Sequence, residues 1–417
     1  MKTRRVVVTG IGALTPIGNN LEEYWNNLKN GVSGASNITL FDATNFKTKF
    51  ACEVKGFDPL DYLDRKESRK MDRFTQLGMA ATSQAIEAAG LDLEKINLER
   101  SGVIWGSGIG GLKTFFDESV NFEKNNQIPR FNPFFIPKMI SDIIAGHISI
   151  KYGFKGPNYT TVSACASSSH AIIDSFNLIK WGKSDLFITG GSEAAVNEPG
   201  VGGFNAMMAL SRRNEDPKTA SRPFDKNRDG FVLGEGSGTL VLEDLEHAID
   251  RGAKIYAEIV GTGMTADAHH ITAPHPEGQG AKRVMEEAIL EAGLKPEDVN
   301  YVNVHGTSTP LGDVAEIKAL ESLLKEHVYN INVSSTKSMT GHLLGAAGAI
   351  ESIASIMAVK HNVVPPTINH TTHDPEINSK IELTLNKKQE KEINTAISNT
   401  FGFGGHNASI LFKKYTE

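Results

Sequence analysis

The sequence has only two cysteines, Cys52 and Cys165, among its 417 residues. So small a number excludes a disulfide framework and a four-cysteine zinc site, and it leaves at most one bridge or one reactive thiol. A reducing compartment is the simpler interpretation. The N-terminus also lacks the long apolar stretch and the small-residue cleavage site of a secretory signal, so we predict a cytoplasmic protein.

Long apolar runs are scarce, and neither sign of charge dominates. The longest apolar stretches, such as residues 350–359, are interrupted by Glu351 and by serines and are well short of the roughly 18 residues that span a bilayer. We therefore expect no membrane insertion. The 43 basic and 49 acidic side chains leave a net charge of -6, which gives no chain-wide attraction for nucleic acid. Glycine, in contrast, is abundant, with 40 residues.

Patterns typical of strands recur in the same order in the two halves of the chain. They lie at 5–12, 102–106, 159–163, 186–191 and 239–243, and again at 255–263, 301–306, 331–335, 395–399 and 409–413. Helical patterns separate them, and Asp313 and Glu316 have the spacing of a capping box at the start of a helix expected over 314–324. The sequence predicts a duplicated α/β unit with mainly parallel sheets, divided into residues 1–252 and 253–417.

Cys165 lies between a β-branched strand pattern and a helical pattern. At the N-terminus of a helix, free N–H groups and the helix dipole stabilise a thiolate and lower the pKa of the thiol. The small residues around Cys165 leave room for a substrate, which favours a nucleophile over a buried structural cysteine. Cys52 has no such setting, and we interpret it as structural.

Two histidines and a lysine fall at notable points of the second half. His305 is expected at the carboxyl edge of the sheet, where glycine and proline turn the chain. His342 opens a helix rich in small residues, and Lys337 precedes it by five residues. The duplication pairs this turn with that of Cys165, so the four side chains are expected to meet as an acyl-transfer site. The alternative is that they are separate core or surface groups.

Two glycine-rich segments permit close approach of the backbone to a ligand. The loop at 401–407 could hold an oxyanion with its N–H groups, although as a bare pattern it fits a tight turn equally well. Residues 106–111 match G-x-G-x-x-G after a strand, which is typical of a dinucleotide site. No acidic strand-end residue about 20 positions further on supports that match, so a nicotinamide-dependent oxidoreductase is the weaker alternative.

These motifs together closely resemble those of the β-ketoacyl-acyl carrier protein synthases, in particular the elongating synthase II type. The similarity runs from residue 5 to the loop at Phe403 and includes HGTSTP at 305–310 and STKSMTGHLLGAAG at 335–348. It implies a homodimer with the thiolase-like α/β fold, in which duplicated βαβαβαββ halves form five layers (α-β-α-β-α). It also implies an acyltransferase of type II fatty acid biosynthesis, which extends a fatty acyl chain by decarboxylative Claisen condensation with malonyl-acyl carrier protein.

The resemblance also implies a role for each residue of the candidate site. Cys165 would receive the acyl chain from the phosphopantetheine of the carrier, and His305 and His342 would hydrogen-bond the malonyl thioester as it loses CO2. Lys337 would order the site electrostatically. The N–H groups of Cys165 and Phe403 would form the oxyanion hole. No cofactor of the enzyme's own is implied, because phosphopantetheine arrives on the acyl carrier protein.

Further positions match residues of the family that contact the substrates. Thr307 and Thr309 match threonines that bind the pantetheine arm. The positions that match the acyl pocket are Ile109, Phe135 and Phe204, with Ile109 where chain length is selected. Two positions depart from many relatives, because His406 stands where threonine is common and Met208 stands where some relatives have an arginine for the carrier.

Two more groups of residues are implied to bind a partner or an ion. A basic stripe on one helix would dock the acidic carrier, whereas a solvated helix face is the ordinary alternative. Its members, at i, i+3, i+4 and i+7, are Lys66, Arg69, Lys70 and Arg73. A structural monovalent cation or a water is implied at a second group. The matching positions are Asn303, Glu351, Ser398 and Asn399.

Related enzymes of the same superfamily provide the competing hypotheses. A ketosynthase of a polyketide or another specialised lipid pathway shares these motifs. A chain-length factor lacks the nucleophile, so Cys165 argues against it. Initiating synthases have asparagine where His342 stands, and thiolases bring a second cysteine from a late loop that has none here.

Overall fold

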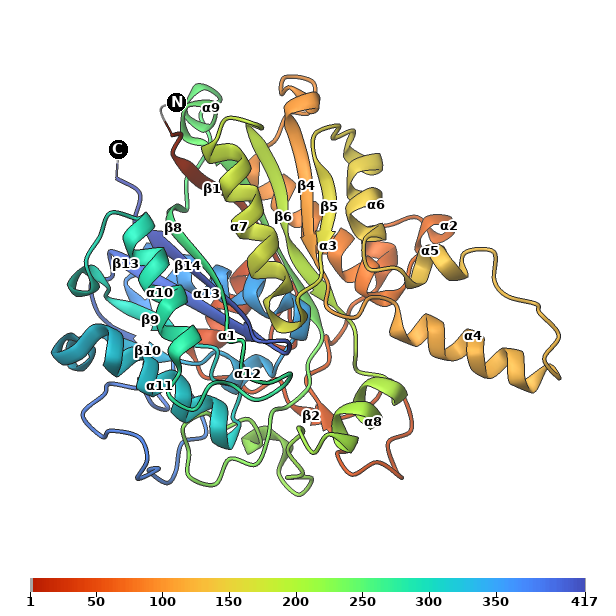
Figure 1. Ribbon diagram of the computed structural model, residues 1–417. Helices are drawn as coiled ribbons and strands as arrows, with labels where there is room; N and C mark the ends of the chain where they lie inside the picture. Colours follow the sequence, from red (N-terminus) through yellow and green to blue (C-terminus); the bar gives the residue numbers. More distant parts are fainter. Residues whose placement is uncertain (1–2, 417) are drawn as a thin grey trace.

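A mixed sheet of ten strands is the centre of the computed structural model, which describes residues 3–416 (Figure 1). The strand order is β10-β9-β13-β14-β8-β1-β7-β6-β4-β5. The N-terminal half contributes β1 (Val6–Leu14), β4 (Ser101–Gly106), β5 (Asn158–Thr161), β6 (Leu186–Glu193) and β7 (Gly236–Asp244). The C-terminal half contributes β8 (Ala257–Ala266), β9 (Tyr301–Asn303), β10 (Asn332–Ser334), β13 (Thr395–Gly402) and β14 (His406–Lys413).

The two halves of the sheet have the same topology. The five strands of each half are counted here from first to fifth along the chain. From the centre of the sheet outward, each half has its first strand, then its fifth, fourth, second and third. The second, third and fourth strands are parallel, and the first and fifth are antiparallel to their neighbours. The halves join where residues 6–8 of β1 pair with 257–259 of β8. The duplication is confirmed, but each half is mixed and not mainly parallel, because short connections such as 403–405 permit only antiparallel neighbours.

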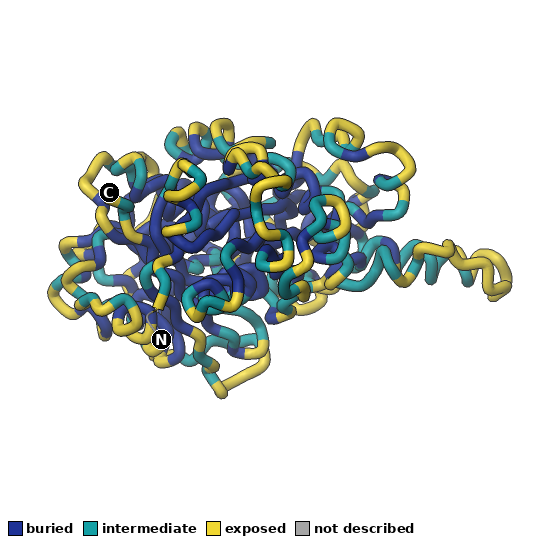
Figure 2. Tube along the Cα trace, turned by 90° about the horizontal axis from the view of Figure 1, so that it is seen from above, coloured by how far each residue is buried: buried dark blue, intermediate teal, exposed yellow. Residues whose placement is uncertain are grey.

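Helices cover the outer faces of both halves and fill the space between them. The outer helices are α3 (Arg73–Ala89) and α6 (Ile143–Tyr152) on the N-terminal half, and α10 (Gln279–Glu291) and α11 (Pro310–Leu324) on the C-terminal half. Between the halves lie α7 (Ser167–Lys180) and α13 (Ala347–His361). Residues of α13 are buried on every side, as a helix between two sheets must be. The five-layer order α-β-α-β-α is therefore present, with buried residues gathered at the centre of the molecule (Figure 2).

Shorter elements surround these layers, and an arm extends away from them. The arm, residues 112–139, contains α4 (Leu112–Lys124) and α5 (Phe135–Met139) and projects from the body in Figures 1 and 2. The other helices are α1 (Leu21–Lys29), α2 (Arg65–Ser68), α8 (Glu198–Ala206), α9 (Leu245–Asp250) and α12 (Lys337–Thr340). Four short strands are β2 (Ser36–Asn37), β3 (Phe50–Ala51), β11 (Val363–Val364) and β12 (Gln389–Glu390). The division between residues 252 and 253 falls between α9 and β8 and stays a prediction.

One predicted helix start is wrong. α11 begins at Pro310, ahead of the start that the spacing of Asp313 and Glu316 indicated. Both carboxylates are buried inside the helix and accept N–H groups of the preceding loop, not those of the first turn. Proline suits that first turn because its missing N–H would have no partner there. Within residues 3–416, none of the helices combines the length and the apolar character that crossing a membrane requires.

Candidate active site

Cys165 lies in a tight turn between a strand and a helix. β5, a 3-10 turn called η3 (Ala164–Ala166) and α7 follow one another in that order. Ala164 has a φ of 50°, a left-handed conformation that residues other than glycine rarely adopt. The hydroxyl of Ser167 stabilises this turn, since it accepts the N–H of Ser163 at 2.9 Å and donates to the carbonyl of Ala164 at 2.7 Å. The backbone therefore presents the thiol in a defined orientation.

The C-terminal half contains the same turn. The 3-10 turn η7 (Leu344–Ala346) precedes α13 as η3 precedes α7, and Leu344 has a φ of 48°. Gly345 therefore occupies the position that Cys165 has in the N-terminal half. His342 lies just before η7, where its backbone N–H donates to the carbonyl of Val232 at 2.7 Å. The duplication thus brings the segment of His342 next to the turn of Cys165.

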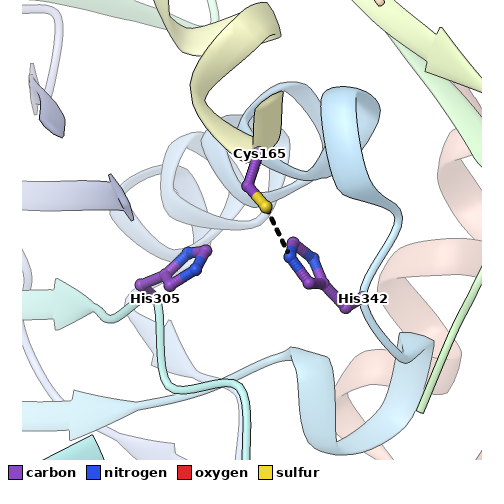
Figure 3. Close-up of side chains that lie close together, drawn as sticks. All are labelled: Cys165, His305 and His342. Carbon is purple, nitrogen blue, oxygen red and sulfur yellow. Dashed lines mark hydrogen bonds between the residues drawn. The ribbon is translucent and has the colours of Figure 1, made fainter. Parts of the chain in front are cut away.

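The thiol and the two imidazoles line one cavity of about 650 Å³ (Figure 3). The Nε2 of His342 is 3.0 Å from the Sγ of Cys165. The rings of His305 and His342 are 5.3 Å apart between centroids and nearly perpendicular, at 86°. One nitrogen of each histidine and the sulfur lie within 4.8 Å of one another. A carbonyl group in this cavity can therefore reach all three side chains.

Buried carboxylates hold the backbone of His305 and of the loop that follows. Glu316 accepts the N–H groups of His305 and Gly306, each at 2.9 Å, and Asp313 accepts the N–H of Ser308 at 3.1 Å. Burial raises the pKa of Glu316 to about 7 and that of Asp313 to about 6, against the lowering effect of these N–H groups. Both residues position the loop from behind, a role that their spacing along the chain did not indicate.

Lys337 is a buried cation beside the site. Its side chain is 1% exposed, and its Nζ lies 2.5 Å from Oε1 of the equally buried Glu351. Burial raises the pKa of Glu351 to about 7, and the charge of Lys337 opposes this rise. After burial itself, Lys337 is the strongest influence that lowers the pKa values of His305 and His342. The ammonium therefore favours uncharged imidazoles.

The lowered pKa expected for the thiol of Cys165 at a helix N-terminus is not found. Burial raises the pKa of Cys165 to about 12, and the charge of Lys337 and the N–H of Phe403 offset only part of that rise. Burial lowers the pKa of His342 well below its ordinary value, which leaves the imidazole uncharged. In the part of the chain that the structure describes, Nδ1 of His342 has no hydrogen-bond partner, so neither tautomer is fixed. Nε2 can therefore accept the thiol proton in one tautomer and donate a hydrogen bond in the other.

The loop between β13 and β14 brings backbone N–H groups to the sulfur. The N–H of Phe403 donates to the thiol of Cys165. A Cβ atom on Gly402 would lie 3.2 Å from the backbone nitrogen of Cys165, so glycine allows β13 to pass this close. Gly404 and Gly405 have φ values of 92° and 76°, which suit the sharp turn at the tip. The two N–H groups implied for an oxyanion hole thus lie beside the same sulfur.

Four of the five residues implied for substrate contact line the cavity, namely Ile109, Phe204, Thr307 and Thr309. The hydroxyl oxygens of Thr307 and Thr309 are 3.1 Å apart. Phe135 is not among the lining residues. It lies on α5 in the arm, where its ring stacks with those of Phe115 and Phe131.

The sequence patterns missed one wall of the cavity. The loop after β8 contributes lining residues between positions 267 and 278, among them His270 and His275. This loop is hydrogen-bonded to the loop of Phe403, because the N–H of Gly404 donates to the carbonyl of Ile271 at 2.7 Å. Three histidines within a few residues, at 269, 270 and 275, were the available signal.

The predicted basic stripe of four residues on one helix is wrong. α2 ends at Ser68, and Arg73 begins a separate helix, α3, whose N-cap is Asp72. The guanidinium of Arg73 is paired with the buried Glu235, with Nη2 and Oε1 2.6 Å apart. Arg73 is therefore engaged inside the protein, because the break between the two helices turns its side chain away from the stripe.

The other three basic residues differ in their surroundings. Lys66 and Arg69 are exposed to solvent. Lys70 is partly buried, and its Nζ pairs with Oε1 of Glu67 at 2.6 Å. Met208, one of the departures from the family pattern, lines the cavity and is 74% exposed. The exposed positive charge of the predicted stripe thus comes from Lys66 and Arg69.

Three of the four residues implied for a cation fit such an ion. Within the described residues, the side-chain oxygens of Asn303 and Ser398 have no hydrogen-bond partner, and those of Glu351 have only the ion pair with Lys337. Buried oxygen atoms of this kind suit a hard cation. The side chain of Asn399 does not fit, because its Oδ1 already accepts the hydroxyl of Ser409 at 2.6 Å.

The backbone N–H groups of the glycine motif at 106–111 are hydrogen-bonded to a carboxylate of the protein itself. The carboxylate of Glu193 accepts the N–H groups of Gly108 at 2.8 Å, Ile109 at 3.1 Å and Gly110 at 3.3 Å. In a dinucleotide site, such N–H groups would face a phosphate. Because a buried carboxylate already occupies them, this observation counts against the nicotinamide alternative.

The fold and this arrangement of side chains define an α/β protein of thiolase-like architecture with a Cys-His-His site. Two family models match the chain, the N-terminal domain of beta-ketoacyl synthase over residues 3–248 and its C-terminal domain over residues 256–371. The chain therefore belongs to the β-ketoacyl synthase family.

Relatives and a solved structure agree with this family. A 3-oxoacyl-[acyl-carrier-protein] synthase 2 of Synechocystis sp. is 50% identical over 416 residues, which cover 100% of this chain and 99% of the relative. A protein of the same description from Staphylococcus aureus is 48% identical over 415 residues, 99% of each chain. A structure of a type II polyketide acyl-carrier protein in complex with its ketosynthase matches with a TM-score of 0.91 at 32% identity, covering 99% of this chain and 100% of that chain.

Proposed function

We propose that this protein is an elongating 3-oxoacyl-acyl carrier protein synthase, which lengthens a fatty acyl chain by two carbons in type II fatty acid biosynthesis. The observation that carries the proposal is the distance of 3.0 Å between Sγ of Cys165 and Nε2 of His342, with His305 beside them in the same cavity. The descriptions of full-length relatives at 50% and 48% identity support it.

In the first half-reaction, the sulfur of Cys165 attacks the thioester carbonyl of an acyl-carrier. The thiol proton passes to Nε2 of His342, and the N–H groups of Cys165 and Phe403 stabilise the oxyanion that forms. The bond between the carbonyl carbon and the phosphopantetheine sulfur then breaks, and the departing sulfur takes the proton from His342. The products are an acyl-thioester on Cys165 and a free carrier thiol.

In the second half-reaction, malonyl-carrier loses CO2 in the same cavity. The electron pair of the broken C–C bond forms an enolate, whose oxygen accepts hydrogen bonds from the Nε2–H groups of His305 and His342. The enolate carbon attacks the acyl carbonyl, the bond to Cys165 breaks, and the sulfur departs as a thiolate that is then protonated. No cofactor of the enzyme's own is proposed, because loss of CO2 generates the nucleophile and phosphopantetheine arrives on the carrier.

The test uses the purified enzyme with its two carriers. Incubation with an acyl-carrier should add the mass of one acyl group to the protein, and subsequent malonyl-carrier should release a 3-oxoacyl-carrier that is two carbons longer. Intact-protein mass spectrometry and analysis of the carrier products measure both steps. Absence of the acyl adduct, or an adduct that malonyl-carrier does not discharge, would contradict the proposal.

The second candidate function is a polyketide ketosynthase, which the matching structure with a polyketide carrier favours. Such an enzyme would extend the chain repeatedly and keep the keto groups. The same product analysis separates the two functions. A single extension per acyl group supports fatty acid elongation, whereas a poly-keto chain on the carrier supports the polyketide pathway.

The arm supports a homodimer as part of the proposal. It exposes large apolar side chains that a monomer would leave in water, among them Phe115 at 49%, Phe131 at 44% and Ile136 at 54%. We propose that a second copy of the chain covers them. Light scattering should give twice the chain mass for the wild-type protein and the chain mass for Phe131→Asp. A monomeric wild-type protein would contradict this part.

A monovalent cation at Asn303, Ser398 and Glu351 is also part of the proposal. Its role would be structural, because a ligand that binds only the folded state raises stability. The melting temperature of the wild-type protein should rise in potassium chloride relative to choline chloride at equal ionic strength, and this increment should disappear in Ser398→Ala. An increment of melting temperature that is the same in both proteins would contradict the cation site.

A cytoplasmic location is also part of the proposal, since both Cys52 and Cys165 are free thiols.

A further inference from the structure

Glu193 is a buried carboxylate directly behind the cavity wall. It is the last residue of β6, and none of its surface is exposed. Gly108, Ile109 and Leu344 line the cavity in front of it, whereas Glu193 itself does not. None of the steps proposed for Cys165 uses this carboxylate.

Both oxygens of Glu193 act only as acceptors. Oε1 accepts the N–H groups of Ile109 at 3.1 Å and Gly110 at 3.3 Å, and Oε2 accepts those of Gly108 at 2.8 Å and Gly345 at 3.0 Å. Burial raises the pKa of Glu193, and these N–H groups oppose the rise. The ionised form matches the surroundings, because four of the five groups bonded to the two oxygens are backbone N–H groups, which cannot accept a proton from the carboxyl.

The duplication explains why a negative charge lies here. Glu193 ends β6 as Gly402 ends β13, and Gly345 has the position of Cys165. In the first turn, Gly402 lies against the N–H of Cys165, the group proposed to bind the oxyanion. In the second turn, the carboxylate of Glu193 accepts the equivalent N–H of Gly345. Glu193 therefore fills, inside the protein, the anion site of the second turn.

The two segments joined by Glu193 are packed too closely to admit another side chain. A Cβ atom on Gly345 would lie 2.3 Å from the nitrogen of Gly108 and 2.6 Å from Oε2 of Glu193. A Cβ atom on Gly108 would lie 2.8 Å from the same oxygen. The segments of Ile109 and Leu344 are therefore in close contact, and the carboxylate of Glu193 is hydrogen-bonded to both.

We propose that Glu193 is a specificity-determining positioning residue, an internal anion that holds the Ile109 wall against the Leu344 wall and so fixes which acyl chains the cavity accepts. This inference rests on the proposed condensing function. Glutamine would keep the size of the side chain but put an NH2 donor in place of one oxygen. Because each oxygen accepts two backbone N–H groups, either orientation of the amide loses two hydrogen bonds and opposes donor to donor.

The experiment compares Glu193→Gln with the wild-type enzyme on butanoyl-, octanoyl- and hexadecanoyl-carrier. The ratio of kcat/KM between the octanoyl and hexadecanoyl substrates should change by about tenfold, because displacement of a pocket wall alters discrimination between chains of different length. Acylation by butanoyl-carrier should persist. An equal loss on all three substrates would overturn the inference. A wild-type enzyme that forms no acyl adduct at all would instead overturn the proposed function.

Glu243→Gln is the matched control for loss of a buried carboxylate. Glu243 is also fully buried, is bonded to Thr9 and Arg251, and does not line the cavity. This variant should lower the melting temperature and leave the chain-length ratio unchanged. If Glu193→Gln does not fold, Ser107→Ala tests the same point, because it removes only the hydroxyl that donates to Oε1 of Glu193 at 3.3 Å. It should change the ratio between the octanoyl and hexadecanoyl substrates by a smaller factor than tenfold, and an unchanged ratio would overturn the inference.

Discussion

The turns at 164–166 and 344–346 have nearly the same backbone conformation, but only the first has a nucleophile at its centre. Each begins with a left-handed residue and leads into a helix between the sheet halves. The first presents the thiol of Cys165 to the cavity, whereas the second has a glycine whose N–H is taken by Glu193. In the second turn the N–H of the middle residue binds an internal anion, and the proposed mechanism gives the equivalent N–H of Cys165 an anion that forms only during the reaction. The side chains around each turn decide whether it can react.

The largest effect is expected at Cys165, where the two turns differ most. Cys165→Ala removes the nucleophile from the first turn, so that neither turn has one. It should abolish the acyl adduct and reduce condensation to background, while the small methyl group keeps the fold. Intact-protein mass spectrometry after incubation with acyl-carrier measures the adduct, and an adduct that persists would contradict the assignment of the nucleophile.

The histidines should separate the two half-reactions. His305→Ala and His342→Ala should each lower the rate of condensation by about 10²–10⁴-fold, because the enolate loses a hydrogen-bond donor. Acylation should remain measurable in both variants but be slower in His342→Ala, since only the Nε2 of His342 is 3.0 Å from the sulfur. Single-turnover acylation, followed separately from release of CO2, measures this. Equal acylation rates in the two variants would mean that the thiol proton leaves by another route.

Removal of the buried ion pair should change the pH dependence. The charge of Lys337 lowers the pKa values of both histidines, so its removal should raise them. Acceptance of the thiol proton requires a neutral imidazole and is lost as pH falls through its pKa. The acid limb of the acylation rate should therefore move to higher pH, by about one unit, in Lys337→Met/Glu351→Gln. The double variant removes both members of the ion pair together, and an acid limb that stays in place would exclude Lys337 as the cause.

The smallest effect is expected outside the cavity. Lys66→Glu/Arg69→Glu reverses the two exposed charges of the predicted stripe and should raise the KM for acyl-carrier by about tenfold at low salt, with less effect at high salt. The KM for a small acyl thioester should not change. Lys95→Glu, at a lysine that is 82% exposed and does not line the cavity, serves as the control. Equal changes for both substrates would argue against carrier docking.

The duplication could be predicted because β-branched segments recur in order along the chain, and each such segment forms a strand by local preference. The neighbours of each turn could not be predicted in this way. Glu193 reaches Gly345 across 152 positions of the sequence, and Arg73 reaches Glu235 across 162 positions. The pKa of Cys165 likewise depends on charged groups from both halves, among them Glu193 and Lys337. Such contacts arise from the tertiary arrangement, which a local pattern does not specify.

The two halves differ in that Glu193 occupies the N–H of the second turn, and this difference has a consequence for how many reactive turns the protein has. Two identical half-chains related by a true twofold axis would present either two reactive turns or two blocked ones. Because both halves are in one chain, one turn can keep an internal anion permanently while the other stays open to transient anions. A single acyl group then has a single place to bind. The volume that a second nucleophile would need is instead part of the cavity wall that determines which acyl chains are accepted.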